Sequence, residues 1–192
     1  MEFLPSPNFL LVEDLVSDSF LLQRQLKKIS DNPEIRFVDS ELSLINALKT
    51  FIPDILITDF NLVGMDAFDV LRIVNEYNEK IPVVVITAHL KNESDRDLLL
   101  EKGASGFFLK EPINTLNERL LPLFSAIVEK NQDNLDNLDR ERKRYDDRKS
   151  HSDFLRAHDF ESEEETELER QSSGFWQSLC RLFSINKRRN FN

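Results

Sequence analysis

Five short, largely apolar runs recur along the first 130 residues, and longer segments with apolar residues at helical spacing separate them. The runs are Phe9–Val12, Ile35–Val38, Ile55–Ile57, Val83–Ile86 and Gly106–Leu109. The intervening helical patterns cover 17–29, 42–51, 67–77, 94–102 and 113–130. Runs this short and this apolar are typical of strands buried on both faces. The alternation predicts an α/β fold: a doubly wound, five-stranded parallel sheet with helices on both faces.

Composition limits the classes of function. Of the 192 residues, 35 are acidic and 25 basic, which gives a net charge of -10 and argues against a nucleic-acid partner. Cys180 is the single cysteine, so a disulfide scaffold is excluded, and three scattered histidines make a zinc cluster implausible. The sequence has no apolar run long enough to span a membrane and no basic leader. We therefore expect a cytoplasmic protein.

Polar residues follow four of the predicted strands. They are Glu13 and Asp14, Asp59, Thr87 and Lys110. Ligand sites of open α/β sheets lie beyond the carboxyl ends of the strands, so these side chains should converge there. Clustered carboxylates suit Mg²⁺, and a carboxylate can itself be a nucleophile that forms an aspartyl phosphate. The chain has only four glycines and no glycine-rich loop, so nucleotide binding is not indicated.

The order of these motifs carries a resemblance to a known family. The segments Phe9–Asp14, Asp54–Asp59, Val83–Ala88 and Gly103–Lys110 resemble the receiver domain of bacterial two-component response regulators. The resemblance covers residues 7–130. It implies a phosphoprotein of two-component phosphorelay signal transduction, with a histidine kinase or phosphotransfer protein as its partner.

The resemblance also implies roles for single residues. Asp59 would be the phosphoacceptor. Mg²⁺ would be bound by Asp59 and Asp14, by Glu13 largely through water, and by the backbone carbonyl of Asn61.

Thr87 and Lys110 would bind the phosphoryl oxygens and, with Asp59, make up the implied catalytic residues. Phe107 falls on the position of an aromatic switch, although an aromatic residue at a strand end is often simply part of the core. Signalling would alter the face formed by the fourth helix, the fifth strand and the fifth helix. We expect no separate catalytic output domain, and hence no enzyme beyond Mg²⁺-dependent self-phosphorylation and dephosphorylation at the aspartate.

Apolar residues thin out sharply after residue 130. Residues 131–145 are predicted as a helical extension, because positions 121, 124, 128, 131, 135, 138, 142 and 145 form a heptad seam with six apolar members. This seam could pair two chains into a homodimer. Alternatively, its first three members pack on the sheet and the rest is a charged, fraying helix. Residues 146–170 are strongly acidic and are predicted as a flexible linker.

Residues 171–192 form a basic amphipathic segment. Phe175, Trp176, Leu179 and Leu182 recur at helical spacing, and four basic side chains accompany them with no acidic one. Such a segment can dock into a partner's groove, fold back on the receiver or lie on an anionic membrane surface.

Two functions of the chain are open at this point. One is a phosphorylation switch without a DNA-binding output domain. The other is a degenerate receiver scaffold that presents residues 171–192 to a partner without being phosphorylated.

Overall fold

The computed structural model describes residues 4, 6–89, 93–130, 132–150 and 152–153. The chain divides into two units, Met1–Arg142 and Lys143–Asn192, and the fold below belongs to the first. Residues 171–192 and most of the predicted acidic linker lie outside the described residues, so the predictions made for them stay predictions.

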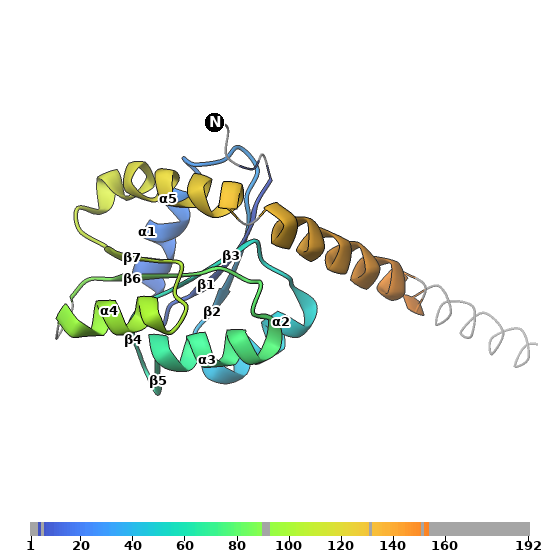
Figure 1. The fold of residues 1–192 in the computed structure, drawn as a ribbon, viewed down its shortest axis with the longest axis horizontal. Helices are drawn as coiled ribbons and strands as arrows, with labels where there is room; N and C mark the ends of the chain where they lie inside the picture. Colours follow the sequence, from blue (N-terminus) through green and yellow to red (C-terminus); the bar gives the residue numbers. More distant parts are fainter. Residues whose placement is uncertain (1–3, 5, 90–92, 131, 151, 154–192) are drawn as a thin grey trace, which may run out of the picture. The chain divides into compact units, whose positions relative to one another are not determined.

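A five-stranded parallel sheet forms the centre of the fold (Figure 1). Its strands, in chain order, are β1 (Asn8–Val12), β2 (Glu34–Val38), β3 (Ile55–Thr58), β6 (Val83–Thr87) and β7 (Gly106–Leu109). They lie in the order β2-β1-β3-β6-β7, so the chain reverses its winding after β2. This arrangement confirms the doubly wound fold that the sequence predicts.

Helices cover both faces of this sheet, α1 and α5 on one face and α2, α3 and α4 on the other (Figure 1). Their bounds are α1 (Val16–Leu26), α2 (Glu41–Thr50), α3 (Ala67–Asn78), α4 (Glu93–Glu101) and α5 (Leu116–Lys130), with a 3-10 turn η1 (Ile113–Thr115) before α5. Local chemistry defines some of the ends. Asp66 caps α3 by accepting hydrogen bonds from Phe68 N and Asp69 N, and Gly103 follows α4 with a φ of 104°.

The apolar strand residues divide between two cores because successive side chains point to opposite faces. Phe9 and Leu11 pack with residues of α1 and α5, and the rings of Phe9 and Phe124 lie 5.6 Å apart. Leu10 and Val12 pack with α2 and α3 on the other face. Burial on both faces explains why the sequence runs are apolar throughout.

A short antiparallel hairpin, absent from the sequence prediction, follows β3. It consists of β4 (Asn61–Leu62) and β5 (Met65–Asp66), joined through Gly64 with a φ of 82°. A positive φ favours glycine at this turn. The hairpin begins two residues after Asp59 and so fixes the chain at the carboxyl end of β3.

Residues 132–150 and 152–153 are helical. We use the name helical extension for residues 132–142, which belong to the first unit. Leu135 and Leu138 of this extension are 4% and 0% exposed and pack into the core on the side of α2 and α3. Arg142 Nη2 lies 2.8 Å from Asp54 Oδ1, and its Nε donates to the carbonyl oxygen of Ile52 at 3.1 Å.

In the second alternative drawn from the heptad pattern, the first seam members pack on the sheet, and Phe124 and Val128 do pack in the core. The contacts of the later members differ from both alternatives. Two leucines of the predicted seam are buried in the protein's own core rather than left for a second chain, and Arg142 is paired with a buried carboxylate rather than fraying. The homodimer itself stays a prediction. The start of the predicted linker, at 146–150, is also helical.

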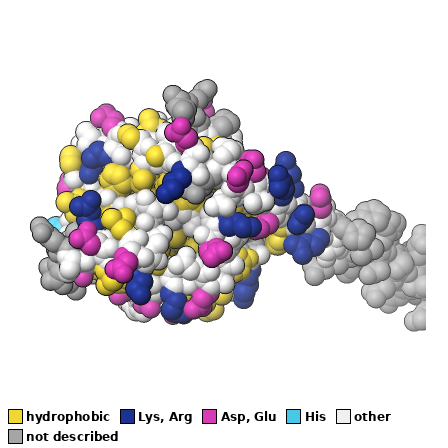
Figure 2. All heavy atoms as spheres, in the orientation of Figure 1, with side chains coloured by type: hydrophobic (Ala, Val, Ile, Leu, Met, Phe, Trp, Pro, Cys, Tyr) yellow, Lys and Arg dark blue, Asp and Glu magenta, His cyan; other side chains and the backbone are white. Residues whose placement is uncertain are grey.

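Basic, acidic and hydrophobic side chains are interspersed over the face of the molecule in Figure 2. Within the part of the chain that the structure describes, none of the helices combines the length and the apolar character needed to cross a lipid bilayer.

Candidate functional site

The predicted site residues meet at the carboxyl end of the sheet because the backbone pairing continues one step past each strand. Asp59 N donates to the carbonyl oxygen of Val12 at 3.0 Å, and Lys110 N donates to that of Thr87 at 2.8 Å. Glu13 N donates to the carbonyl oxygen of Val38 at 3.0 Å. The parallel register therefore brings the ends of β1, β3, β6 and β7 to one edge.

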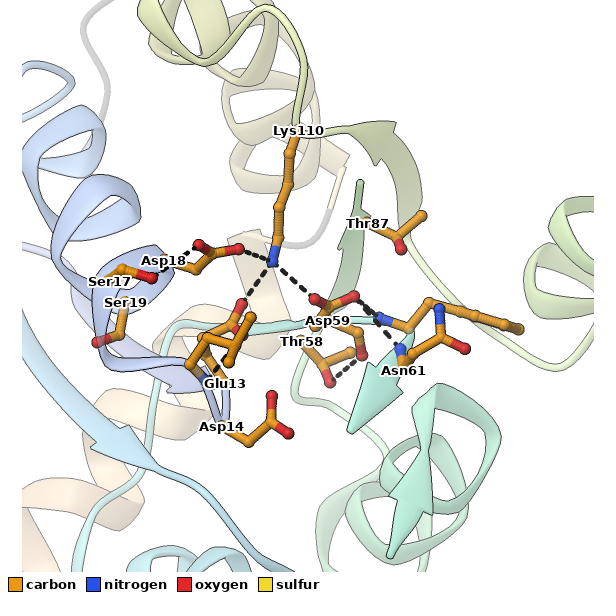
Figure 3. Close-up of polar contacts among 12 residues, drawn as sticks. Glu13, Asp14, Ser17, Asp18, Ser19, Thr58, Asp59, Asn61, Thr87 and Lys110 are labelled. Carbon is orange, nitrogen blue, oxygen red and sulfur yellow. Dashed lines mark hydrogen bonds and ion pairs between the residues drawn. The ribbon is translucent and has the colours of Figure 1, made fainter. Parts of the chain in front are cut away.

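Lys110 joins three carboxylates at this edge (Figure 3). Its Nζ lies 2.7 Å from Glu13 Oε2, 2.7 Å from Asp18 Oδ2 and 2.6 Å from Asp59 Oδ2. The side chains of Glu13 and Lys110 are only 1% and 7% exposed. A buried ammonium needs such partners, because an unpaired charge inside a protein is costly.

The environment shifts two pKa values. Burial alone would lower the pKa of Lys110, but its hydrogen bonds to Asp18, Asp59 and Glu13 outweigh burial and raise that pKa well above the ordinary value. Lys110 is therefore a fixed positive charge at neutral pH. Burial raises the pKa of Glu13 above its ordinary value, with the hydrogen bond and the charge of Lys110 opposing that rise.

Both oxygens of Asp59 have partners. Oδ2 accepts from Lys110, and Oδ1 accepts from the backbone N–H of Phe60 and, at 3.3 Å, from that of Asn61. The start of the β4–β5 hairpin thus orients the carboxylate. A carboxylate oriented in this way is positioned to act as a nucleophile.

Asp18 is a member of the cluster that the sequence prediction does not include. It lies in the first turn of α1, four residues after Asp14. This turn follows β1 closely, so its side chains can reach the end of that strand. Oxygens of Glu13, Asp18 and Asp59 all lie within 4.8 Å of one another. This is a set of hard oxygen donors, and its chemistry fits Mg²⁺ or a similar divalent cation.

Asp14, a predicted metal ligand, lies beside this group rather than in it. Its Oδ2 accepts a hydrogen bond from Val63 N at 3.1 Å, so it is tied to the turn of the hairpin. Asn61, another predicted ligand, contributes its N–H to Asp59. The metal-binding roles of both residues stay predictions.

The side chains of Thr87 and Phe107 make contacts outside the cluster of Lys110 and its carboxylates. Thr87 is 1% exposed, and its hydroxyl donates to the carbonyl oxygen of His89 at 3.1 Å rather than to a carboxylate. Phe107 is half-buried and packs against the core on the side of α2 to α4. Its role as a switch stays a prediction.

The comparison with known proteins shows the family of this chain. Residues 9–120 match the response regulator receiver domain family, and the chain belongs to that family. The chain is 27% identical over 121 residues to the chemotaxis protein CheY-3 of Vibrio cholerae, a match that covers 62% of this chain and 92% of that protein. It is 33% identical over 131 residues to the response regulator PleD of Caulobacter vibrioides, covering 65% of this chain and 28% of PleD.

Solved structures give the same fold. The signal receiver domain of a putative LuxO repressor protein from Vibrio parahaemolyticus matches with a TM-score of 0.57 and 25% identity, over 66% of this chain and 96% of that one. The Mn²⁺-bound form of the response regulator Rcp1 matches with a TM-score of 0.52 and 26% identity, over 62% and 92% of the two chains.

Several of the matched relatives are much longer proteins. The matches span 35% of a protein-glutamate methylesterase of Treponema denticola, 24% of the transcriptional regulator NtrC of Proteus hauseri and 28% of PleD. The similarity to these proteins is therefore a similarity to their receiver portions.

Proposed function

We propose that this chain is a phosphoacceptor response regulator in which Asp59 receives a phosphoryl group from a histidine kinase or phosphotransfer protein. The observation that carries the proposal is the contact of Lys110 Nζ with Asp59, Glu13 and Asp18, all within 2.7 Å. A permanent cation beside an oriented carboxylate is what an anionic transferring group requires.

The proposed reaction is an in-line transfer. A carboxylate oxygen of Asp59 forms a bond to phosphorus while the phosphorus–nitrogen bond of the donor phosphohistidine breaks. The imidazole nitrogen keeps the electron pair of that bond and takes up a proton. Lys110 stabilises the negative charge on the transferring oxygens, because it already lies at hydrogen-bond distance from Asp59.

Mg²⁺ is the proposed cofactor. We propose Glu13, Asp14, Asp59 and the backbone carbonyl of Asn61 as its ligands, with Asp18 as a further carboxylate within reach. When bound, the ion would neutralise the acidic cluster and coordinate a phosphoryl oxygen. The Mn²⁺-bound relative Rcp1, 26% identical to this chain, supports a divalent cation here.

The proposed output is a changed protein–protein contact. A phosphoryl group on Asp59 would offer the Thr87 hydroxyl a charged acceptor in place of the His89 carbonyl. Movement of Thr87 would free space for Phe107 to turn inward and would alter the face formed by α4, β7 and α5. We also propose that the protein acts in the bacterial cytoplasm, where such a kinase would meet it.

Acetyl phosphate with Mg²⁺ tests the proposal, with intact protein mass as the measurement. We expect one added phosphoryl group on the wild type and none on Asp59→Asn. Asp136→Asn, which changes an exposed carboxylate on the helical extension, is the matched control and should be phosphorylated like the wild type. No adduct, together with no binding of beryllofluoride, would favour the degenerate scaffold.

A further inference from the structure

Arg119 binds the backbone of the segment that carries Lys110. It lies in the first turn of α5, and its Nη1 donates to the carbonyl oxygen of Leu109 at 2.9 Å. Its Nη2 donates to the carbonyl oxygens of Lys110 at 3.2 Å and Pro112 at 2.9 Å. One side chain thus holds three carbonyl groups between the end of β7 and η1.

The backbone of Lys110 is consequently fixed on both sides. Its N–H donates to the carbonyl oxygen of Thr87, and its own carbonyl accepts from Arg119. The ammonium at the other end of the side chain contacts the three carboxylates. A displacement of this segment would change the distance between Nζ and Asp59, because the side chain starts from this backbone.

Helix stability does not explain a cation at this position, because Arg119 donates to carbonyl oxygens that precede α5. Its Nε is buried without a hydrogen-bond partner in the part of the chain that the structure describes. The three carbonyl contacts must therefore compensate for this cost. The fork of a guanidinium can bind several carbonyls at once, which a lysine ammonium does less well.

We propose that Arg119 is a positioning residue that holds Lys110 in register with Asp59. The inference rests on the proposed function, since it gives Arg119 a role through the phosphoryl contact of Lys110. Among the described residues, the hydrogen bonds of Arg119 go to the backbone of residues 109–112 rather than to Asp59.

Beryllofluoride with Mg²⁺ is the probe, and its dissociation constant, measured by fluorine NMR, is the readout. We expect Arg119→Met to weaken binding by about tenfold or more, since small errors of position are costly at such sites. Arg119→Lys should lie between Arg119→Met and the wild type. Arg72→Met is the control, because Arg72 is a half-exposed arginine on α3 whose ion pairs within the described residues are with Asp69 and Glu76.

The same substitution in a Lys110→Ala background separates positioning from a merely structural role. If Arg119 acts through Lys110, adding Arg119→Met to the Lys110→Ala variant should change its dissociation constant for beryllofluoride by less than about twofold. A purely structural defect would weaken both backgrounds equally and would appear in the thermal unfolding midpoint of both.

The possible outcomes are distinct. Two results overturn the positioning role and leave the proposed function intact, provided that the wild type binds beryllofluoride. In the first, Arg119→Met binds it with the wild-type dissociation constant. In the second, Arg119→Met weakens binding by the same factor in the wild-type and the Lys110→Ala backgrounds. If the wild type itself does not bind beryllofluoride, the proposed function fails and the positioning role fails with it. If Arg119→Met does not fold, Arg119→Lys decides by the same comparison.

Discussion

Leu138 offers a direct test of how the helical extension is used. The residue is 0% exposed and packs in the core on the side of α2 and α3. Leu138→Ala removes three carbon groups, which costs about 2.4 kcal/mol of transfer free energy at about 0.8 kcal/mol each. The cavity left behind raises the total to about 3 kcal/mol or more.

Urea unfolding gives the measurement. With a slope of about 2 kcal/mol/M, this loss lowers the unfolding midpoint of Leu138→Ala by about 1.5 M. Leu121→Ala is the matched control, because Leu121 belongs to the same predicted seam but is 39% exposed on α5, so its loss should be about 1 kcal/mol or less.

Two results would refute this reasoning. Equal shifts in the two variants would mean that Leu138 is not buried in solution. A wild-type midpoint that rises with protein concentration, and loses that dependence in Leu138→Ala, would mean that the seam pairs two chains, because only an oligomer has a concentration-dependent stability.

Three further predictions concern the site. Glu13→Gln should raise the thermal unfolding midpoint, because burial disfavours the charged carboxylate of Glu13. We expect a rise of about 2–4 °C, which corresponds to about 1 kcal/mol of unfolding free energy in a chain of this size. A fall in the midpoint would contradict this prediction. Lys110 has a pKa raised in the folded state, so its stabilisation should be complete below pH 10.5, its ordinary value, and be lost only as pH rises further. The urea stability difference between wild type and Lys110→Met should therefore stay constant from pH 7 to about pH 10, and a decline already near pH 8 would be the opposite result. Thr87→Val should abolish the beryllofluoride-induced shift of the Phe107 ring resonances and Thr87→Ser should preserve it; a shift retained in Thr87→Val would exclude the hydroxyl as the link.

The sheet and most of the acidic cluster can be predicted from the sequence for one physical reason. Strands buried on both faces leave continuous apolar runs, and the residue after each run must lie at the sheet's carboxyl edge. Glu13, Asp59 and Lys110 follow their strands directly, so the position of each follows from where its run ends.

Features set by helix phase and long-range packing are not predictable in this way. Asp18 reaches the cluster only because α1 begins at Val16 and turns it toward Lys110. Leu135 and Leu138 show the helical spacing that a seam between chains also shows, and only the fold decides that the core of the same chain covers them. The contacts of Arg119 depend on backbone carbonyls, which leave no trace in the pattern of side chains.

Chemical identification of the modified residue tests the central claim most directly. Borohydride reduces an aspartyl phosphate to homoserine, so peptide mass mapping after phosphorylation and reduction marks the acceptor. We predict conversion at Asp59 alone, dependent on Mg²⁺. Conversion at another carboxylate instead, or none when a phosphohistidine donor is supplied and beryllofluoride also fails to bind, would contradict the assignment of this chain as a phosphoacceptor at Asp59.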